Sequence, residues 1–195
     1  MKDPVDLPGI RNITVSGRIG SGATTLAVKL GEALSWDVLD GGKLFRKINQ
    51  DLGMSITESN SRPDHFDLKY EERVKKILRT ETHSIIQSHL AGFDAQGIDG
   101  VFKILIICED EHGEDKKEIR IDRLVNRDGV SIESAKHEVG ERERQHLEKF
   151  RRLYANNNQE WVYWDKKYYD LVISTYNHNQ DETLRLALAR VGYKG

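Results

Sequence analysis

The most constraining feature of this sequence is a glycine-rich turn between an apolar segment and an amphipathic one. The stretch runs from Ile13 to Leu34 and reads ITVSGRIGSGATTLAVKLGEAL. Its start has the length of a buried strand, and the apolar residues after the turn repeat at helical spacing. Glycines allow several amide N–H groups to point into one hollow, and the following helix adds the positive end of its dipole. This turn is therefore expected to bind a polyphosphate.

The turn fits most of the phosphate-loop pattern G-x-x-x-x-G-K-[ST]. Gly17 and Gly22 occupy the glycine positions, and Thr24 supplies the hydroxyl that would bind Mg²⁺. The lysine position holds Ala23, so a mobile cation is missing beside the phosphates. The nucleotide is expected to contact the whole loop, which comprises Gly17, Arg18, Ile19, Gly20, Ser21, Gly22, Ala23, Thr24 and Thr25. A tight strand-to-helix turn without a ligand is the alternative.

Five strand-sized apolar segments alternate with longer stretches of helical spacing. We expect strands at Ile10 to Ser16, Trp36 to Asp40, Ser84 to Ser88, Phe102 to Glu109 and Tyr169 to Thr175. This alternation predicts an α/β fold with a parallel sheet and helices on both faces. Residues 1–9 hold two prolines and a glycine and are expected to be a flexible leader outside the fold. Residues 10–195 are then expected to be one domain.

Composition excludes several other classes of protein. The chain has 30 Lys and Arg against 32 Asp and Glu, a net charge of −2, which gives no electrostatic footprint for nucleic acid or an anionic membrane. No apolar run approaches the roughly 20 residues that span a bilayer. The single cysteine, Cys108, cannot form an intrachain disulfide and fits a reducing compartment. We expect a cytoplasmic protein with no nucleic-acid or membrane partner.

Two polar stretches between the expected strands are too long for simple crossovers, at about residues 43–82 and 110–154. In the second, Arg123 and Arg127 are four residues apart and share one helix face, which Asp128 and Gly129 end. Arg123 and Arg144 have acidic neighbours in the sequence and are expected to form surface salt bridges. The charged run at residues 109–118 is expected to be a solvated loop that enters a helix. The aromatic residues at 161–169 either stack on a base or form a small core under a lid helix.

Short motifs follow one another in a fixed order along the chain. They are Gly41 to Arg46 (GGKLFR), Gly53 to Ser55 (GMS), His89 to Phe93 (HLAGF), Arg142-Glu143 on a helix that ends at Tyr154, and Tyr169 to Thr175 (YDLVIST). Together with the glycine-rich turn, they resemble the archaeal-type branch of the cytidylate kinases, small P-loop nucleoside monophosphate kinases. The resemblance covers nearly all of residues 10–188.

The resemblance implies both a fold and a reaction. The fold is a P-loop NTPase-type three-layer α/β/α domain with a five-stranded parallel sheet. Residues 43–82 then form a monophosphate-binding insertion, and residues 110–154 form an arginine-rich lid. The reaction transfers the γ-phosphoryl group of ATP to CMP or dCMP with Mg²⁺, and the protein is expected to be a monomer. Phosphoryl transfer needs positioned positive charge and the exclusion of water, which a closing lid supplies.

The resemblance also assigns roles to single residues. Arg127 and Arg142 are expected to act on the phosphates as catalytic residues together with Thr24. The acceptor nucleotide is expected to be bound by Arg46, Arg73, His89 and Lys43. Asp40, at the end of the second expected strand, either binds Mg²⁺ through water or caps the next helix.

Three positions depart from the family's pattern. They are Ala23, Lys43 in place of an acid, and Gln87-Ser88-His89 in place of Glu-x-Arg. They leave open a non-catalytic ATP-binding module or a kinase for another small phosphate acceptor. Arg18 and Arg127 are expected to compensate for the missing lysine. His89 is either a cation that contacts the acceptor phosphate or a neutral side chain bonded to a carbonyl.

Overall fold

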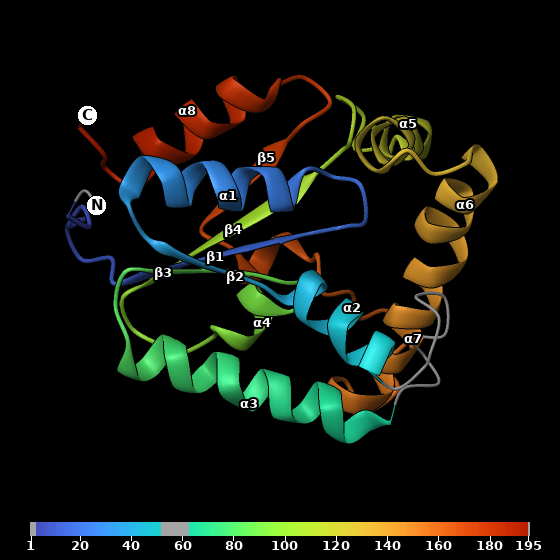
Figure 1. The fold of residues 1–195 in the computed structure, drawn as a ribbon, viewed down its shortest axis with the longest axis horizontal. Helices are drawn as coiled ribbons and strands as arrows, with labels where there is room; N and C mark the ends of the chain where they lie inside the picture. Colours follow the sequence, from blue (N-terminus) through green and yellow to red (C-terminus); the bar gives the residue numbers. More distant parts are fainter. Residues whose placement is uncertain (1–2, 52–62, 195) are drawn as a thin grey trace.

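The computed structural model describes residues 3–51 and 63–194. Within them, five parallel strands form one sheet in the order β2-β3-β1-β4-β5 (Figure 1). The strands are β1 (Asn12–Gly17), β2 (Asp37–Asp40), β3 (Ser84–Gln87), β4 (Val101–Ile107) and β5 (Leu171–Ser174). All five expected strands are confirmed, and their ends lie within two residues of the prediction.

Helices cover both faces of the sheet, which confirms the three-layer α/β/α architecture. Their bounds are α1 (Ala23–Leu34), α2 (Gly41–Asp51), α3 (Asp64–Thr80), α4 (Ala91–Asp94), α5 (Lys117–Asp128), α6 (Ile132–His137), the π-helical turn η2 (Glu138–Arg142), α7 (Glu143–Tyr154), the 3₁₀ turn η3 (Lys166–Tyr168) and α8 (Gln180–Arg190). Figure 1 shows α1 and α8 on one side of the sheet, with α3 and α4 on the other.

The core explains why these segments fold as they do. All six residues of β1 are buried, as expected for the central strand of a parallel sheet that is covered on both faces. On one face, Leu26 and Leu30 of α1 pack in a cluster with Ile13 and Ile104. On the other face, Val74 and Leu78 of α3 pack in a cluster with Ile86. The helical and strand periodicities read from the sequence therefore correspond to two cores, one on each side of the sheet.

The prediction of a flexible leader is wrong for residues 3–9. Leu7 is 6% exposed and belongs to the same core cluster as α1. The amide of Val5 donates to the Leu34 carbonyl at 2.9 Å, and its carbonyl accepts from the Trp36 indole N–H at 2.9 Å. Residues 3–9 are therefore bound to the domain by the buried side chain of Leu7 and by the hydrogen bonds of Val5 with Leu34 and Trp36.

The topology places the carboxyl ends of β1, β2 and β3 at one edge of the sheet, where ligands bind in open α/β sheets. The glycine-rich turn follows β1, Asp40 is the last residue of β2, and His89 lies just after β3. The first long polar stretch supplies most of α2 and all of α3, and the second supplies α5, α6, η2 and α7. The Gly53 to Ser55 motif lies outside the described residues.

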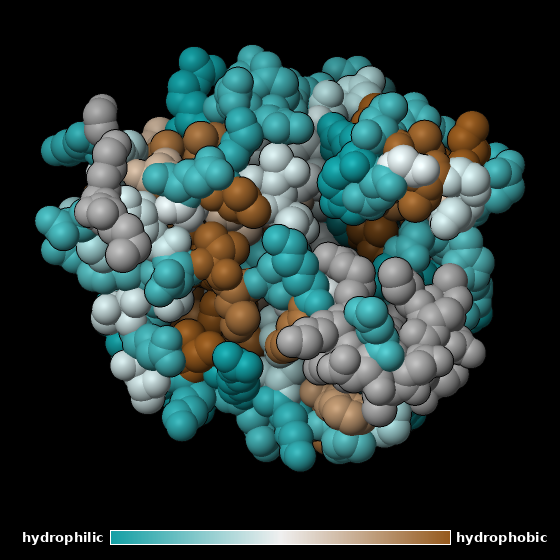
Figure 2. Space-filling view, in the orientation of Figure 1, coloured by the Kyte–Doolittle hydropathy of each residue, from teal (hydrophilic) through white to brown (hydrophobic). Residues whose placement is uncertain are grey.

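The surface carries few large exposed apolar side chains. Figure 2 shows mostly hydrophilic residues, with hydrophobic ones gathered at the outer edge of the sheet near β2 and over α5 and α6. Val38 of β2 and Ile132 of α6 are among the exposed apolar residues. No helix within residues 3–51 and 63–194 has the length and apolar character needed to cross a membrane.

Candidate nucleotide site

The glycine-rich turn connects the end of β1 to the start of α1. Gly20 and Gly22 have φ angles of 76° and 103°, in the left-handed region that favours glycine. A side chain at Gly17 would place its Cβ 2.8 Å from the carbonyl oxygen of Ile106, so this position has no room for one. Thr24 and Thr25 are half-buried in the first turn of α1. The loop geometry thus agrees with a phosphate cradle at a helix N-terminus.

The two lid arginines that the sequence singled out lie at the ends of neighbouring helical segments. Arg142 ends η2 and forms an ion pair with Glu138 one turn earlier. Arg127 lies in the last turn of α5, its side chain is 52% exposed, and it donates to Asp128 at 2.7 and 2.6 Å. The hydrogen bond to Asp128 raises the pKa of Arg127, and the negative charge of Asp40 adds to this effect. Arg127 therefore lies within electrostatic reach of the end of β2.

His89 is held at the loop in its neutral form. Its Nδ1 lies 2.9 Å from the carbonyl oxygen of Gly17, and aromatic rings enclose it, with Tyr163 5.3 Å away between centroids. Burial lowers the pKa of His89, and the positive charge of Arg142 lowers it further, although the Gly17 hydrogen bond opposes both. This environment favours the alternative of a neutral side chain bonded to a carbonyl. A role for His89 in acceptor binding stays a prediction.

Arg18 does not project freely toward a ligand. Its guanidinium forms ion pairs with Glu143 of α7 and with Asp115, the latter at 3.2 Å, and lies over the ring of Trp164 at 4.4 Å. Arg120 of α5 contacts the same two acids. Sequence reasoning missed Arg120 and Asp115, because both lie in charged segments that are typical of solvent-exposed surface. It singled out Glu143 only as the second residue of the Arg142-Glu143 motif and assigned it no partner.

The remaining lid arginines divide into two kinds. The expectation for Arg144 is confirmed, since it is exposed and pairs with Glu141 and Glu148. The expectation for Arg123 is wrong. Its guanidinium donates to the Thr175 hydroxyl at 2.7 Å and to the Ser21 carbonyl at 3.3 Å, so it supports the back of the loop. Four-residue spacing had placed Arg123 on the same helix face as Arg127, and at Arg123 that face is turned toward the loop.

The residues that were expected to bind the acceptor or to lie beside it are not brought together by the described contacts. One oxygen of Asp40 accepts the amide N–H of Lys43 at 2.9 Å, as the capping alternative requires. The other oxygen, Oδ2, is buried and has no hydrogen-bond partner among the described residues. Lys43 and Arg73 are exposed on α2 and α3. Arg46 belongs to α2, but its side chain lies outside what the structure describes.

Ion pairs connect the lid helix to the insertion. The buried Lys149 of α7 contacts Asp67 of α3 at 2.7 Å. Arg152 of α7 donates to both oxygens of Asp64 at 2.5 and 2.9 Å. The aromatic residues after α7 form the expected small core, in which Tyr163 is fully buried and packs with Phe150. These contacts hold α7 against both α3 and the end of β3.

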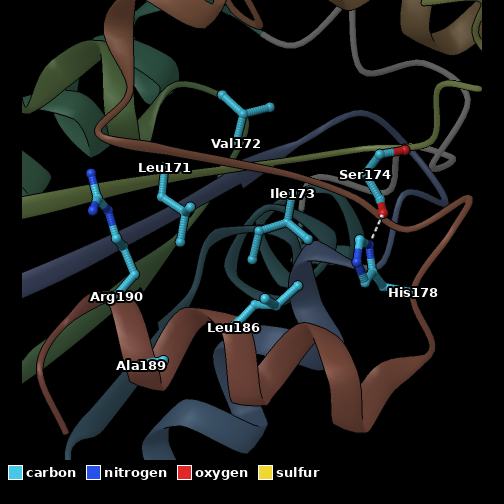
Figure 3. A pocket seen from close by; sticks show the side chains of 8 residues that line it. All are labelled: Leu171, Val172, Ile173, Ser174, His178, Leu186, Ala189 and Arg190. Carbon is cyan, nitrogen blue, oxygen red and sulfur yellow. Dashed lines mark hydrogen bonds between the residues drawn. The ribbon is translucent and has the colours of Figure 1, made fainter. Parts of the chain in front are cut away.

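A separate pocket of 380 Å³ lies between β5 and α8, on the far edge of the sheet. Figure 3 shows Leu171 and Ile173 facing Leu186 across it, while His178 bonds to the Ser174 carbonyl. The residues that line this pocket include none of the loop and none of the lid arginines. We place the candidate site at the loop, where backbone amides and cations converge.

Comparisons with known proteins give the family and the fold. The model of the Cytidylate kinase-like family matches residues 12–177. A cytidylate kinase of Methanopyrus kandleri is 29% identical over 184 residues, which cover 92% of this chain and 92% of that protein. Among solved structures, an uncharacterized protein from Eubacterium ventriosum has a TM-score of 0.62 at 17% identity and covers 94% of this chain and 99% of that one. A gluconokinase from Sinorhizobium meliloti has a TM-score of 0.55 at 14% identity, with coverages of 95% and 92%. At these identities the two structures show the fold alone.

The lowered pKa of His89 predicts how stability depends on pH. The unfolded chain binds the proton at about pH 6.5, above the pKa in the folded protein. The stability that neutral His89 contributes is therefore complete above about pH 6.5 and is lost as the pH falls toward the folded pKa. Between about pH 7.5 and 5.5, urea denaturation should show a larger loss of unfolding free energy for the parent than for His89→Gln. The exposed His112 provides a control, since His112→Gln should follow the parent. A smaller loss in the parent than in His89→Gln would mean that His89 is a cation in the folded protein.

Proposed function

Because the chain belongs to the cytidylate kinase-like family, we propose that it transfers the γ-phosphoryl group of ATP to CMP or dCMP, giving CDP or dCDP. It is a phosphotransferase of the nucleoside monophosphate kinase type, and the proposal concerns the acceptor. The observation that carries it is the family match over residues 12–177, within which the loop and both lid arginines lie.

The loop binds and orients the phosphates of ATP. Amide N–H groups of Gly20, Gly22, Ala23 and Thr24 and the positive end of the α1 dipole meet the phosphate oxygens, whereas the Ser21 amide donates to the Arg18 carbonyl at 3.0 Å. The hydroxyl of Thr25 reaches a phosphate nearer the nucleoside. Backbone donors hold their positions during the reaction, since Gly17 packs against the β4 carbonyl and Gly22 begins the helix. They stabilise the triphosphate without the reorganisation that a flexible side chain would need.

The lid supplies the mobile positive charge. With alanine at position 23, the transferred phosphoryl group must be met by cations from another element. Arg18 is already balanced by Glu143 and Asp115, which leaves Arg127 and Arg142 as the better placed groups. Their present partners, Asp128 and Glu138, are on the same helices, so exchange for a phosphate needs only side-chain rotation. Positive charge beside the transferred phosphoryl group stabilises the transition state. Closure of the lid excludes water from the site.

The residues at the loop fit a Mg²⁺ ion. Asp40 offers a buried carboxylate oxygen without a hydrogen-bond partner among the described residues, and Thr24 offers a hydroxyl in the first turn of α1. Hard oxygen donors of this kind, with phosphate oxygens and water, are what Mg²⁺ prefers. A Mg²⁺ ion held by these residues would supply positive charge that neutralises the charge developing on the phosphates. Asp40 would then bind it through water while still capping α2.

The residues at the end of β3 that depart from the family's pattern are also consistent with a different phosphate acceptor. Gln87, Ser88 and a neutral His89 stand where the resemblance leads one to expect an acid and an arginine. A site with fewer charges at the end of β3 suits an acceptor whose phosphate is held by α2 and the lid instead. The panel of acceptors in the assay below distinguishes the two possibilities.

We predict ADP release from Mg·ATP in the presence of CMP or dCMP. A coupled assay with CMP, dCMP, UMP, AMP and GMP should give the highest kcat/KM for the two cytidine nucleotides, since the fold and motifs match that family. The rate with ATP alone is the background. Absence of ADP above background for every monophosphate would contradict the proposed reaction, and a preference for another acceptor would correct only the substrate.

Arg142→Ala should lower kcat about a hundredfold and raise the KM for ATP much less. A lid arginine acts on charge that develops at the transferred phosphoryl group, and removing one preorganised group costs on the order of 3 kcal/mol. Arg144→Ala is the matched control, because Arg144 lies two residues away, is exposed and pairs only with surface acids among its described contacts. Equal kcat values for the two variants would place Arg142 outside the reaction.

A further inference from the structure

Glu143, the first residue of α7, is a buried carboxylate that three donors share. It is 4% exposed. Arg18 Nε donates to its Oε1 at 3.0 Å, and the amide of Ile19 and Arg120 Nη1 donate to its Oε2 at 3.2 and 2.8 Å. Burial disfavours the charge, but hydrogen bonds from Arg18 and Arg120 outweigh it and lower the pKa of Glu143. The carboxylate is therefore ionised in the folded protein.

The network around Glu143 carries no net charge. Asp115 accepts Arg120 Nη2 at 2.7 Å and pairs with Arg18 Nη1 at 3.2 Å, so two guanidiniums face two carboxylates. Arg120 is fully buried. A balanced group of this kind tolerates burial, whereas removal of one member leaves an uncompensated charge in a poorly solvated place. The four side chains come from the loop, the segment before α5, α5 itself and α7.

The network holds the front of the phosphate loop by its backbone. The carbonyl of Ile19 accepts Arg120 Nη1 at 2.7 Å, while its amide donates to Glu143, so both peptide groups beside Ile19 are bonded to lid residues. Gly20 passes so close to α5 that a Cβ there would lie 2.6 Å from the Arg120 carbonyl. The path of residues 18–20 thus depends on where α5 and α7 lie.

We propose that Glu143 is a positioning residue for phosphoryl transfer, which acts by tying Arg18 and Ile19 of the loop to the lid helix that carries Arg142. It does not touch the nucleotide. Through this carboxylate, the position of Arg142 and the conformation of the phosphate loop depend on each other. This inference rests on the proposed phosphotransferase function for its kinetic part, while its structural part concerns the loop alone.

The alternative is that Glu143 only stabilises the fold. A structural role lowers stability in Glu143→Gln but leaves the kcat of the folded fraction unchanged. Positioning predicts a specific kinetic loss, because small displacements of reacting groups cost large factors in rate. Glu143→Gln keeps the size and an acceptor oxygen but removes the charge. Its kcat should fall tenfold or more by that principle, about 1.4 kcal/mol, with a smaller change in the KM of either substrate.

A double-mutant cycle separates the two roles. If Glu143 acts through Arg18, then Arg18→Gln should lower kcat similarly, and Arg18→Gln with Glu143→Gln should be no worse than the more damaged single variant. Multiplicative losses in the double variant would overturn the proposal. Glu141→Gln is the control, since Glu141 lies two residues away on the same helical stretch and pairs with the exposed Arg144. It should match the parent.

Amide hydrogen exchange gives a readout that needs no turnover. Exchange at residues 18–20 should be faster in Glu143→Gln and Arg18→Gln than in the parent and in Glu141→Gln. If the parent phosphorylates no acceptor, the proposed function is wrong. Independently of activity, unchanged amide exchange at residues 18–20 in Glu143→Gln would show that Glu143 does not hold the loop. If the parent is active, a kcat of Glu143→Gln within about twofold of the parent, corrected for folded fraction, rejects positioning. If Glu143→Gln does not fold, Arg18→Gln decides by the same measures, because its side chain is nearer the surface.

Discussion

A phosphate loop without its lysine must obtain positive charge from elsewhere, and much of this structure follows from that constraint. Backbone amides and a helix dipole can hold a triphosphate, but they cannot follow a phosphoryl group as it moves. Here the movable cations lie on α5 and η2, outside the loop. Such a site works only if the lid returns to the same place relative to the loop. The lid is held in a fixed position relative to the loop by the buried contacts among Arg18, Arg120, Asp115 and Glu143.

The lid is held from two sides, and the two sides differ in kind. Toward the loop, the contacts are buried and charge-balanced, so they break at a high energetic cost. Toward the insertion, Arg152 and Asp64 are partly exposed, and exposed pairs contribute little. Among the residues that the structure describes, Lys149 and Asp67 add one buried pair on that side. Among the described contacts, α7 is therefore held more firmly by the loop and α5 than by α3.

Sequence periodicity predicted the fold well because burial on both faces leaves a clear record in the chain. Five apolar segments gave five strands, and glycines at positions 20 and 22 marked the turn, where left-handed φ angles are required. The site was predicted less completely. Arg120 and Glu143 are 23 residues apart in sequence, and nothing in a charged segment indicates which charges will meet in the interior. Arg123 was misjudged for the same reason, since its acidic neighbours in sequence are not its partners in space.

The leader and His89 show a second limit. Val5 and Leu7 are too few to form a periodic pattern, yet Val5 bonds to the end of α1 and Leu7 packs in the core cluster that includes α1. For His89, the residue type left both a charged and a neutral state open, and burial beside Arg142 is what favours the neutral one. In both cases the deciding factor is a long-range contact. The sequence shows which side chains are present, but their neighbours in space are set by the tertiary fold.

We propose that the lid arginines, in place of a loop lysine, supply the positive charge at the transferred phosphoryl group. The most direct measurement compares kcat of Arg127→Ala with and without Ala23→Lys, using Ala23→Met as an uncharged control of similar length. If the charge is interchangeable, the lysine restores most of the kcat that Arg127→Ala loses, and methionine restores none of it. An undiminished kcat in Arg127→Ala, or equal values with lysine and methionine at position 23, would contradict this account.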